Sequence, residues 1–479
     1  MIRCRRSRRA AGQALGEPQS SGATRALGAC TPFLVLENEL GLLQEVVAFQ
    51  LLDRVHIGPD IPARGRVRGA TVRRGICVRK RRIQTDPTGG DMVFQFKAYF
   101  RTAFESVFYM KAPWTPTRVA SMVLFFGVFP AAQVVNKIAL TVDELLYPDY
   151  KKTPVREPVF IIGNARSGTT LMQRLMSLDE DRFSSLKLWD LILLPIWMKK
   201  IVHAAARFDQ ARGGKMADAL ERVQARLLRN ADAIHQLRLN QPEEDEGVMI
   251  HVWASAFLGL VFPVPVTADF MFFDEMPGPR RKLLMGWYKR CIQRHLYCQK
   301  PGLQLLSKNP MFTTKISSVL ETFPDARVIY MVRSPYETVA SVHNLVEKLW
   351  NIQLKLPPDA EPREKLAEHC YYSYDYALSV LDNHDPAASY VVKYDDLVKD
   401  PMAVITKVYE HFGYTMSDRT RARFEEACER ARRYKSRHKY SLEQYGFTRE
   451  QVYRDARRVF ERFGFDKGDV KDLEEPSVA

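Results

Sequence analysis

The feature that most constrains the fold of this chain is the stretch from Pro158 to Met176, which reads PVFIIGNARSGTTLMQRLM. It begins with a continuous apolar run at residues 159–162, which is typical of a buried strand in a parallel sheet. A polar turn, GNARSGTT, follows, and from Leu171 onward apolar residues recur at helical spacing. A strand, a glycine-bounded turn and a helix N-terminus form a cradle for an anion, because loop N–H groups converge there and the helix dipole favours negative charge.

The turn departs from the phosphate-binding loop of nucleotide kinases, which reads Gly-x4-Gly-Lys-Ser/Thr. Gly163 and Gly168 keep the glycine spacing, but Thr169 stands in the position of the lysine, and Arg166 lies inside the loop. That lysine serves the β- and γ-phosphates of a nucleoside triphosphate, so its absence argues against hydrolysis of ATP or GTP. For this stretch taken alone, a strand-to-helix turn without a ligand is the alternative.

The charge of the chain is unevenly distributed. The 479 residues carry a net charge of +15, of which residues 1–91 contribute +8. The remaining, moderately basic part suits a polyanionic nucleotide, although such a charge is also common in proteins that bind no anion. No basic motif with interleaved aromatic residues is present, so nucleic acid is not expected as a partner.

Cysteine usage bears on metal sites and on the compartment. The seven cysteines include no Cys-x-x-Cys and no Cys/His spacing typical of zinc, so no metal is expected. An odd number of cysteines without a framework favours reduced thiols, and the sequence contains no Asn-x-Ser/Thr glycosylation site. Both observations favour the cytoplasmic side of a membrane, with the Golgi lumen as the alternative.

Residues 1–91 differ from the rest of the chain. Their first part is rich in arginine and poor in acids, as in organellar transit peptides, but the acidic stretch from Glu37 to Asp53 does not fit that interpretation. The alternative is a disordered or non-native extension, with Met92 as the true initiator. No function is drawn from these residues.

A second distinct segment covers residues 92–150, which we expect to be helical. Residues 119–132 are strongly apolar but contain Pro130, and fourteen apolar residues are short for a membrane span, which needs about 20. The pattern favours a kinked helix that either packs in the core or makes a peripheral membrane contact through residues 110–140. Both interpretations stay open.

From residue 151 to about residue 470 the pattern alternates between strands and helices. Short apolar runs that predict strands, each followed by a helical pattern, lie at 303–306, 327–332 and 390–394. This alternation predicts an α/β fold of the P-loop NTPase type, in three layers around a central parallel sheet, with a helical insert at 200–300. Ligands of such sheets bind beyond the carboxyl ends of the strands, where Lys308 and Arg333 are expected beside the anion loop.

Carboxylates in two places are candidates for a catalytic base. Asp190 is set among apolar residues, so it is either a polar tether or a base with a raised pKa. Residues 243–246 are four consecutive acids, which cannot all be buried in ionised form. Either they complement the dipole of a following helix, or one of them, Glu243 or Glu244, faces the site.

Several separate segments together resemble the PAPS-dependent sulfotransferases, in the branch that includes many bacterial proteins and, more distantly, protein-tyrosine sulfotransferases. The resemblance covers residues 110–465 and rests on the segments RSGTT, LSKNP, FPDARVIYMVRSPYETVASVHNL, VVKYDDLVKDP and HKYSLEQYGF. It implies transfer of a sulfuryl group from PAPS (3′-phosphoadenosine 5′-phosphosulfate) to a hydroxyl of a carbohydrate, a lipid or another alcohol.

The resemblance also implies which residues hold the donor. The loop would grip the 5′-phosphosulfate, and Arg333 with Ser341 would hold the 3′-phosphate. Physical reasoning agrees, because a guanidinium at a strand end can bind a phosphate through two hydrogen bonds and a serine eight residues later lies on the same helix face. The donor-binding residues implied are Arg166, Ser167, Gly168, Thr169, Thr170, Arg333, Ser341 and Lys435.

For the transfer step, the resemblance implies that Lys308 and Arg166 steady the charge on the transferring group, although Asn309 replaces the aspartate that follows the lysine in the family. Asp190 stands where the family carries a glutamate base, and its shorter side chain puts that role in doubt. Glu243, Glu244 and His251 are the alternatives. A sulfuryl group carries less negative charge than a phosphoryl group, so no metal is required.

The C-terminal segment YKSRHKYSLEQYGF resembles the part of the family that closes over the nucleotide, which implies contacts from Lys435, His438 and Tyr440. A solvated basic stretch is the alternative interpretation.

Two rival functions and the acceptor stay open. The rivals are a P-loop kinase or NTPase, and a catalytically inactive, membrane-associated binding protein on the same fold. The apolar segment 119–132 and the aromatic-rich segment 253–273 favour a lipophilic or membrane-presented alcohol among small-molecule, glycan and lipid acceptors.

Overall fold

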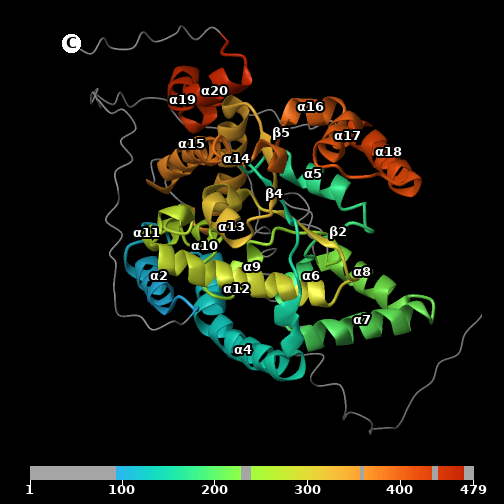
Figure 1. Ribbon diagram of the computed structural model, residues 1–479. Helices are drawn as coiled ribbons and strands as arrows, with labels where there is room; N and C mark the ends of the chain where they lie inside the picture. Colours follow the sequence, from blue (N-terminus) through green and yellow to red (C-terminus); the bar gives the residue numbers. More distant parts are fainter. Residues whose placement is uncertain (1–92, 228–238, 356–360, 434–440, 469–479) are drawn as a thin grey trace, which may run out of the picture. The chain divides into compact units, whose positions relative to one another are not determined.

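The computed structural model describes residues 93–227, 239–355, 361–433 and 441–468 (Figure 1). All of them belong to the compact unit Gln44–Ala479. The predictions for residues 1–91 and for Lys435, His438 and Tyr440 fall outside the described residues and stay predictions.

The centre of the fold is a sheet of five strands in the order β2-β3-β1-β4-β5, in which every pairing is parallel. The strands are β1 (Val159–Ile162), β2 (Phe183–Ser184), β3 (Gln304–Lys308), β4 (Arg327–Val332) and β5 (Ser389–Lys393). The predicted parallel sheet is therefore confirmed. The sequence pattern missed β2, because a strand of two residues is too short to produce a periodic signal.

Alternate residues of the strands face two different hydrophobic clusters. Phe160 and Ile162 belong to one cluster, whereas Val159 and Ile161 belong to the other, as the two-residue period of a strand requires. The first cluster includes residues of α12 (Gly278–Tyr297), α13 (Ile316–Thr322) and α15 (Glu361–Leu381). The second includes residues of α5 (Thr169–Met176), α17 (Pro401–His411) and α18 (Asp418–Arg433). Helices thus cover both faces, and the predicted three-layer fold is confirmed (Figure 1).

A long helix near the start of the described chain differs from its sequence expectation. It runs without a break over residues 116–146, through α3 (Pro116–Val123), the π-helical turn η1 (Leu124–Val128) and α4 (Phe129–Leu146). Before the proline the helix widens into the turn η1, where the N–H of Phe129 donates to Leu124 O, and Pro130 lies in the first turn of α4. The kink expected at Pro130 stays a prediction. The helix is long and apolar enough to cross a membrane, with a mean hydropathy of 1.7.

The remaining helices complete the covering layers. The short helix α2 (Phe96–Phe108) precedes the long one, and the stretch Tyr147-Pro148 ends the long helix as expected. Between residues 200 and 300, the described part holds helices and turns without a strand. The other elements are η2 (Pro148–Lys152), α6 (Leu188–Ile192), α7 (Ile196–Gln210), α8 (Lys215–Leu227), α9 (Gly247–Ile250), α10 (Leu258–Val261), α11 (Pro265–Ala268), η4 (Phe273–Glu275), η5 (Pro310–Lys315), α14 (Pro335–Gln353), η6 (Pro386–Ala388), α16 (Tyr394–Lys399), η7 (Glu443–Tyr445), α19 (Arg449–Asp455) and α20 (Arg457–Phe463).

Candidate functional site

The anion loop connects the central strand β1 to α5, and two glycines fix its path. Gly163 has a φ of +136°, and a Cβ there would lie 2.2 Å from Met331 O of the neighbouring strand. Gly168 has a φ of +92°, and a Cβ there would lie 2.8 Å from the ring of Tyr394. Both positions therefore require glycine, because a side chain would be strained and would also collide with its neighbours.

The polar side chains inside the loop divide into structural and accessible ones. Ser167 is fully buried, and its hydroxyl donates to Asn164 O at 2.6 Å, which closes the turn. Asn164 Nδ2 in turn donates to Cys370 O at 3.1 Å, tying the loop to α15. Thr169 and Thr170 form the first turn of α5, where Thr169 is buried and Thr170 is half-buried. Backbone N–H groups and Thr170 are thus the loop groups best able to meet an anion.

Arg166 is exposed and adopts a left-handed backbone with a φ of +71°. This conformation is uncommon for a residue with a side chain, and such positions cluster at ligand sites. Its Nε donates to Ser341 Oγ on α14 at 3.2 Å, and its carbonyl oxygen accepts from Arg333 Nη1 at 3.1 Å. The structure therefore brings Arg166 together with Arg333 and Ser341, which lie more than 150 positions later in the sequence.

Arg333 follows β4 and is held from three sides. Besides Arg166 O, its Nε donates to Glu337 Oε2 at 2.7 Å, and its guanidinium lies 4.3 Å from the ring centre of Tyr394. The aromatic ring holds the guanidinium in a fixed orientation, so the side chain loses less conformational entropy when a phosphate binds. Glu337 is exposed, so a phosphate can replace its carboxylate.

Lys308 ends β3 at the same edge of the sheet and pairs with Glu244. Its Nζ lies 2.6 Å from Glu244 Oε1, and the side chains are 1% and 20% exposed, respectively. A buried ammonium beside a partly accessible carboxylate provides both a positive charge and a proton acceptor at one place. This pairing was not anticipated, because 64 residues separate the two positions.

The other acids of the 243–246 run are partnered rather than used as helix caps. Glu246 is fully buried and binds Lys315 Nζ at 2.7 and 2.6 Å through its two oxygens, while Asn309 Nδ2 donates to it at 3.1 Å. Burial raises the pKa of Asp245 to about 6, and the neighbouring Glu246 charge adds to this. No acid lies in the first turn of α9, and the buried Lys315 neutralises Glu246, so the structure does not support the interpretation that these acids complement a helix dipole.

Asp190, the expected position of the base, is buried in a structural network. Its carboxylate accepts from Lys187 N at 3.1 Å and lies 2.8 Å from Lys199 Nζ and 3.4 Å from His295 Nδ1. Burial alone would raise the pKa of Asp190, but the neighbouring His295 and Lys199 lower it below its usual value. A carboxylate whose side chain is 1% exposed and whose pKa is lowered is a poor proton acceptor for an incoming hydroxyl, so the contacts favour the polar-tether interpretation.

The two remaining alternatives for the base are His251, which is half-buried like Glu244, and Glu243, which is buried. Asn136 Nδ2 donates to His251 Nδ1 at 3.2 Å, and His251 Nε2 donates to Leu191 O at 2.8 Å. Burial lowers the pKa of His251, so its ring stays neutral as a link between α4 and α6. Glu243 is buried, and its N–H donates to Leu186 O at 2.9 Å.

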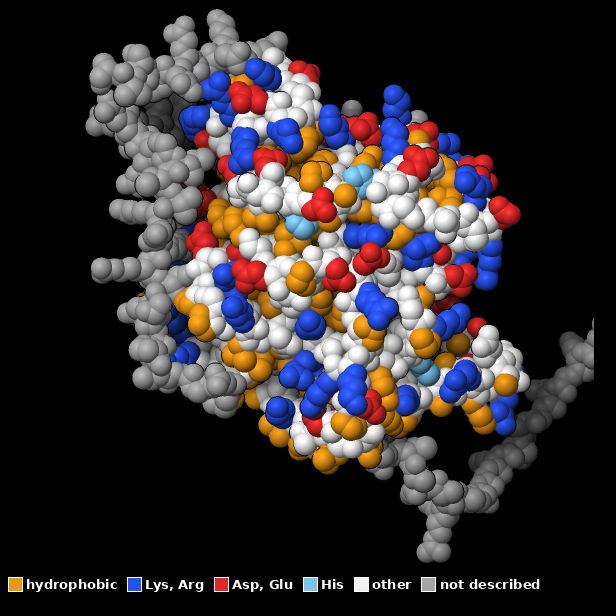
Figure 2. Space-filling model, viewed as in Figure 1, with side chains coloured by type: hydrophobic (Ala, Val, Ile, Leu, Met, Phe, Trp, Pro, Cys, Tyr) orange, Lys and Arg blue, Asp and Glu red, His pale blue; other side chains and the backbone are white. Residues whose placement is uncertain are grey.

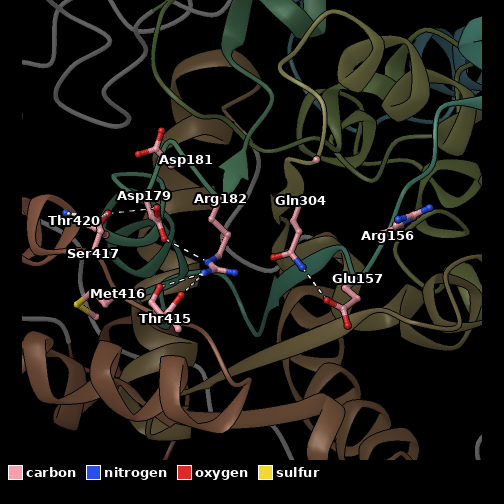
Figure 3. A pocket seen from close by; sticks show the side chains of 11 residues that line it. Arg156, Glu157, Asp179, Asp181, Arg182, Gln304, Thr415, Met416, Ser417 and Thr420 are labelled. Carbon is pink, nitrogen blue, oxygen red and sulfur yellow. Dashed lines mark hydrogen bonds and ion pairs between the residues drawn. The ribbon is translucent and has the colours of Figure 1, made fainter.

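The cavity in Figure 3 lies at the opposite edge of the sheet and is not part of this site. It has a volume of about 550 Å³, and Gln304 at the start of β3 and Glu157 just before β1 contribute to its lining. Several of its polar groups contact one another: Gln304 Nε2 donates to Glu157 Oε2 at 3.0 Å, and Arg182 lies 3.5 Å from Asp179 and donates to Thr415 O at 3.1 Å. Ligands of parallel sheets bind at the carboxyl ends, so chemistry places the site at the anion loop.

Two contributors to the site were missed by sequence reasoning. Tyr394 packs against both Gly168 and Arg333, and its place directly after β5, at the carboxyl edge, was an available signal. Lys315 neutralises Glu246 from η5, and nothing in its sequence surroundings distinguishes it from a surface lysine. Among the residues that the structure describes, no group of three or more His, Cys, Asp or Glu side chains could hold a metal ion.

Comparison with known proteins decides the family. A profile described as the sulfotransferase family matches residues 158–418, which is more than half of the chain and includes the loop, Lys308 and Arg333. The chain belongs to the sulfotransferase family. It is therefore a transferase, and PAPS is the sulfuryl donor general to the family.

Known proteins of two kinds are similar to this chain. The omega-hydroxy-beta-dihydromenaquinone-9 sulfotransferases of Mycobacterium bovis and Mycobacterium tuberculosis are 26% identical to this sulfotransferase over 327 residues, which cover 65% of this chain and 76% of theirs. Among solved structures, a Mycobacterium avium sulfotransferase has a TM-score of 0.60 at 20% identity and covers 79% of this chain and 99% of its own. A Mycobacterium tuberculosis sulfotransferase has a TM-score of 0.58 at 20% identity, with 75% and 91% covered. These structures share the fold.

Proposed function

We propose that this sulfotransferase transfers the sulfuryl group of PAPS to the hydroxyl of a lipophilic alcohol. The observation that carries the proposal is the convergence of Arg166, Ser341 and Arg333 beside the anion loop, through hydrogen bonds of 3.2 and 3.1 Å. Two guanidinium groups and a hydroxyl at a loop without the Walker lysine suit a nucleotide with separate 5′- and 3′-phosphate groups better than they suit ATP.

In this proposal the donor occupies the loop in two places. The N–H groups of residues 166–170 and the Thr170 hydroxyl bind the 5′-phosphosulfate, and Arg333 with Ser341 binds the 3′-phosphate. The ion pair of Arg333 with Glu337 opens when the phosphate arrives, and Tyr394 keeps the guanidinium oriented. The pair is exposed enough for this exchange, since the Glu337 side chain is 54% exposed.

For the transfer step we assign Glu244 as the base in preference to Asp190, Glu243 and His251. Its carboxylate takes the proton of the acceptor hydroxyl while the hydroxyl oxygen attacks sulfur. The new O–S bond forms as the bond from sulfur to the bridging phosphate oxygen breaks, and adenosine 3′,5′-bisphosphate leaves. Lys308 and Arg166 stabilise the charge on the sulfuryl oxygens and on the leaving phosphate. The contact between Lys308 and Glu244 supports this assignment, because it places the stabilising cation beside the proposed base.

A lipophilic acceptor is supported by two observations. The characterised mycobacterial relatives carry a name that describes a hydroxylated menaquinone derivative as their acceptor. In this chain, the segment that bears Glu244 continues into Val252 and Trp253, which contact α2 and the residue just before it. Gln95 N donates to Val252 O at 2.9 Å, and Trp253 Nε1 donates to Thr102 Oγ1 of α2 at 3.2 Å.

The first test is calorimetric titration of the full chain with adenosine 3′,5′-bisphosphate and, in parallel, with ATP. Binding of the bisphosphate with at best weak binding of ATP is expected. A folded protein that binds ATP and not the bisphosphate would overturn the donor assignment in favour of a P-loop kinase.

The second test measures transfer from labelled PAPS to extracted lipids and, separately, to glycans. We expect labelled lipid product that persists in the presence of a chelator, and a Glu244→Gln variant that binds the bisphosphate normally but turns over about 100-fold more slowly. Bisphosphate binding without transfer to any lipid or glycan would favour the inactive binding protein. A Glu244→Gln variant with unchanged turnover would return the base to Glu243 or His251.

A further inference from the structure

The exposed apolar side chains of this protein are gathered on a few neighbouring helices. In the described part of the chain, all large exposed apolar side chains other than Val391 and Val398 lie between Phe96 and Val223, on α2, on the helix 116–146 with the turn before it, and on α7 and α8. We call the outward side chains of these helices the apolar face; Phe108, Trp114, Val134 and Ile138 belong to it and are 58–69% exposed. Such a concentration is unusual for a surface that meets only water.

The helices of the apolar face are joined by direct contacts, so the face is one surface. Tyr99 OH of α2 donates to Phe126 O of η1 at 3.1 Å. At the other end, Trp197 Nε1 of α7 donates to Ala139 O of α4 at 3.1 Å. Figure 1 shows α2, α4 and α7 following one edge of the molecule, and Figure 2 shows hydrophobic side chains with interspersed lysine and arginine along that edge.

We propose that the apolar face docks this sulfotransferase on the surface of an anionic lipid bilayer, with the helix 116–146 lying in the interface rather than crossing it. The charges of the face suit that partner. Among residues 96–146, four exposed Lys and Arg stand against one half-buried acid, and among residues 196–223 five exposed Lys and Arg stand against two exposed acids. Basic side chains around an apolar surface are attracted to anionic headgroups. A second copy of this chain would instead bring two positive faces together, which opposes association.

The inner side of the same helix explains why it lies on the membrane and does not span it. Phe125 and Phe129 belong to the main core and stack around Trp253, with ring centres 6.1 and 5.4 Å away. Asp143 is fully buried, accepts from Ile196 N at 2.8 Å, and lies 3.3 Å from Arg294 Nε. Moving this helix into a bilayer would remove the carboxylate from these partners and expose it to hydrocarbon, which is costly.

Aromatic residues mark the depth of the contact. Tyr109 and Trp114 lie in the turn between α2 and the long helix, are 66% and 58% exposed, and Trp114 stacks on the Arg118 guanidinium at 4.2 Å. Amphipathic aromatic rings beside cations favour the headgroup level of a bilayer. The face also adjoins the acid segment, because Asn136 of α4 donates to His251. Docking itself does not depend on the proposed donor or acceptor.

The test is flotation of the full chain with vesicles of phosphatidylcholine, with and without phosphatidylglycerol. We expect the protein to float with the anionic vesicles and less with the neutral ones. A triple variant, Phe108→Ser/Val134→Gln/Ile138→Gln, should partition at least about tenfold less. The matched control is Val391→Gln/Val398→Gln, which removes two apolar side chains that are each 43% exposed and lie elsewhere, and it should float as the unchanged protein does.

Three results would overturn the proposal. One is a protein that floats with neither kind of vesicle, and another is a triple variant that floats as well as the unchanged protein. The third is an unchanged protein that is a dimer in solution and becomes a monomer in the triple variant, since the face would then be a contact between copies. Equal thermal midpoints and equal binding of adenosine 3′,5′-bisphosphate show that the variants are folded, so a failure of docking is distinguishable from a failure of the donor site.

Depth is tested with lipids that carry bromine at defined positions of the acyl chain. Quenching of tryptophan fluorescence is measured for the unchanged protein and for Trp114→Phe, and the difference between the two gives the depth of Trp114 in the bilayer. We expect strong quenching by bromine near the headgroup and weak quenching by bromine near the bilayer centre. The reverse order would contradict the interfacial position proposed for Trp114.

Discussion

Arg333 Nη1 donates to the carbonyl oxygen of Arg166 at 3.1 Å, so the guanidinium that follows β4 holds the backbone of the loop that follows β1. The two strands are direct neighbours, with Ile162 paired to Tyr330, which brings their carboxyl ends side by side. The contact couples the two halves of the proposed donor site. We therefore expect that binding at one phosphate position orders the other.

Removing the Arg333 side chain should abolish the 3′-phosphate subsite. We expect Arg333→Ala to weaken binding of adenosine 3′,5′-bisphosphate by about 100-fold, because a charge-assisted, bidentate contact to phosphate is lost. Binding of adenosine 5′-phosphate should change much less, which calorimetry measures directly. Arg430→Ala, which removes an exposed arginine paired within α18, is the control and should bind normally. Equal losses for both nucleotides would show that Arg333 acts on the loop alone.

Gly168 should not tolerate a methyl group. An alanine there would combine a positive φ with a Cβ 2.8 Å from the Tyr394 ring, so we expect Gly168→Ala to lower the thermal midpoint and to weaken bisphosphate binding. Gly446→Ala separates the two causes, because Gly446 has a φ of +79° but no atom within 4 Å of the added Cβ. If both variants lose the same stability and keep their bisphosphate affinity, the contact with Tyr394 has no part in shaping the loop.

The buried pair of Lys315 with Glu246 should be costly to break from one side. We expect Lys315→Met to destabilise the protein by about 3–5 kcal/mol in urea unfolding, because it leaves Glu246 buried without its cation. A second change, Glu246→Gln, should recover part of this loss in the double variant. The exposed pair of Lys152 with Asp149 is the control, and Lys152→Met should leave the free energy of unfolding close to that of the unchanged protein. No recovery in the double variant would contradict the charge explanation.

Asp245 should make stability depend on pH. Burial raises its pKa to about 6 in the folded protein, above the value of about 3.9 expected in the unfolded chain. The folded state therefore holds the proton more tightly, and this contribution is present below pH 4 and is lost as the pH rises to about 6. Asp245→Asn removes the titration while keeping an oxygen that can accept from Tyr288, its hydrogen-bond partner.

The measurement is the free energy of unfolding of both proteins at several pH values. Relative to the unchanged protein, the Asp245→Asn variant should become more stable between pH 4 and 6, by on the order of 2–3 kcal/mol. Comparing the two proteins cancels the titration of the other groups. Glu461→Gln, at an exposed site, should run parallel to the unchanged protein. A constant difference between Asp245→Asn and the unchanged protein would show that Asp245 does not titrate in this range.

The sequence by itself determined the parts of the fold that depend on local pattern. The runs 159–162 and 327–332 became β1 and β4 at their predicted bounds, because a strand buried on both faces is nearly continuously apolar; in β4 only the first residue, Arg327, is charged and it is half-buried. The run at 390–394 was shifted by one residue, since Tyr394 begins α16. The anion loop was readable for the same reason, because glycine spacing reflects local backbone geometry. The order of strands and helices then placed the loop, Lys308 and Arg333 at one edge of the sheet.

The tertiary structure alone decided which charges meet. Asp190, the expected base, pairs with Lys199 and His295, whereas Glu244 pairs with Lys308. These contacts join residues far apart in the chain, and sequence spacing carries no information about them. Burial is equally non-local. The outer side of the helix 116–146 is exposed because no other element of the described chain covers it, and this depends on how the elements are assembled. A pattern along the chain specifies the elements, but partners and solvent exposure exist only once those elements are assembled.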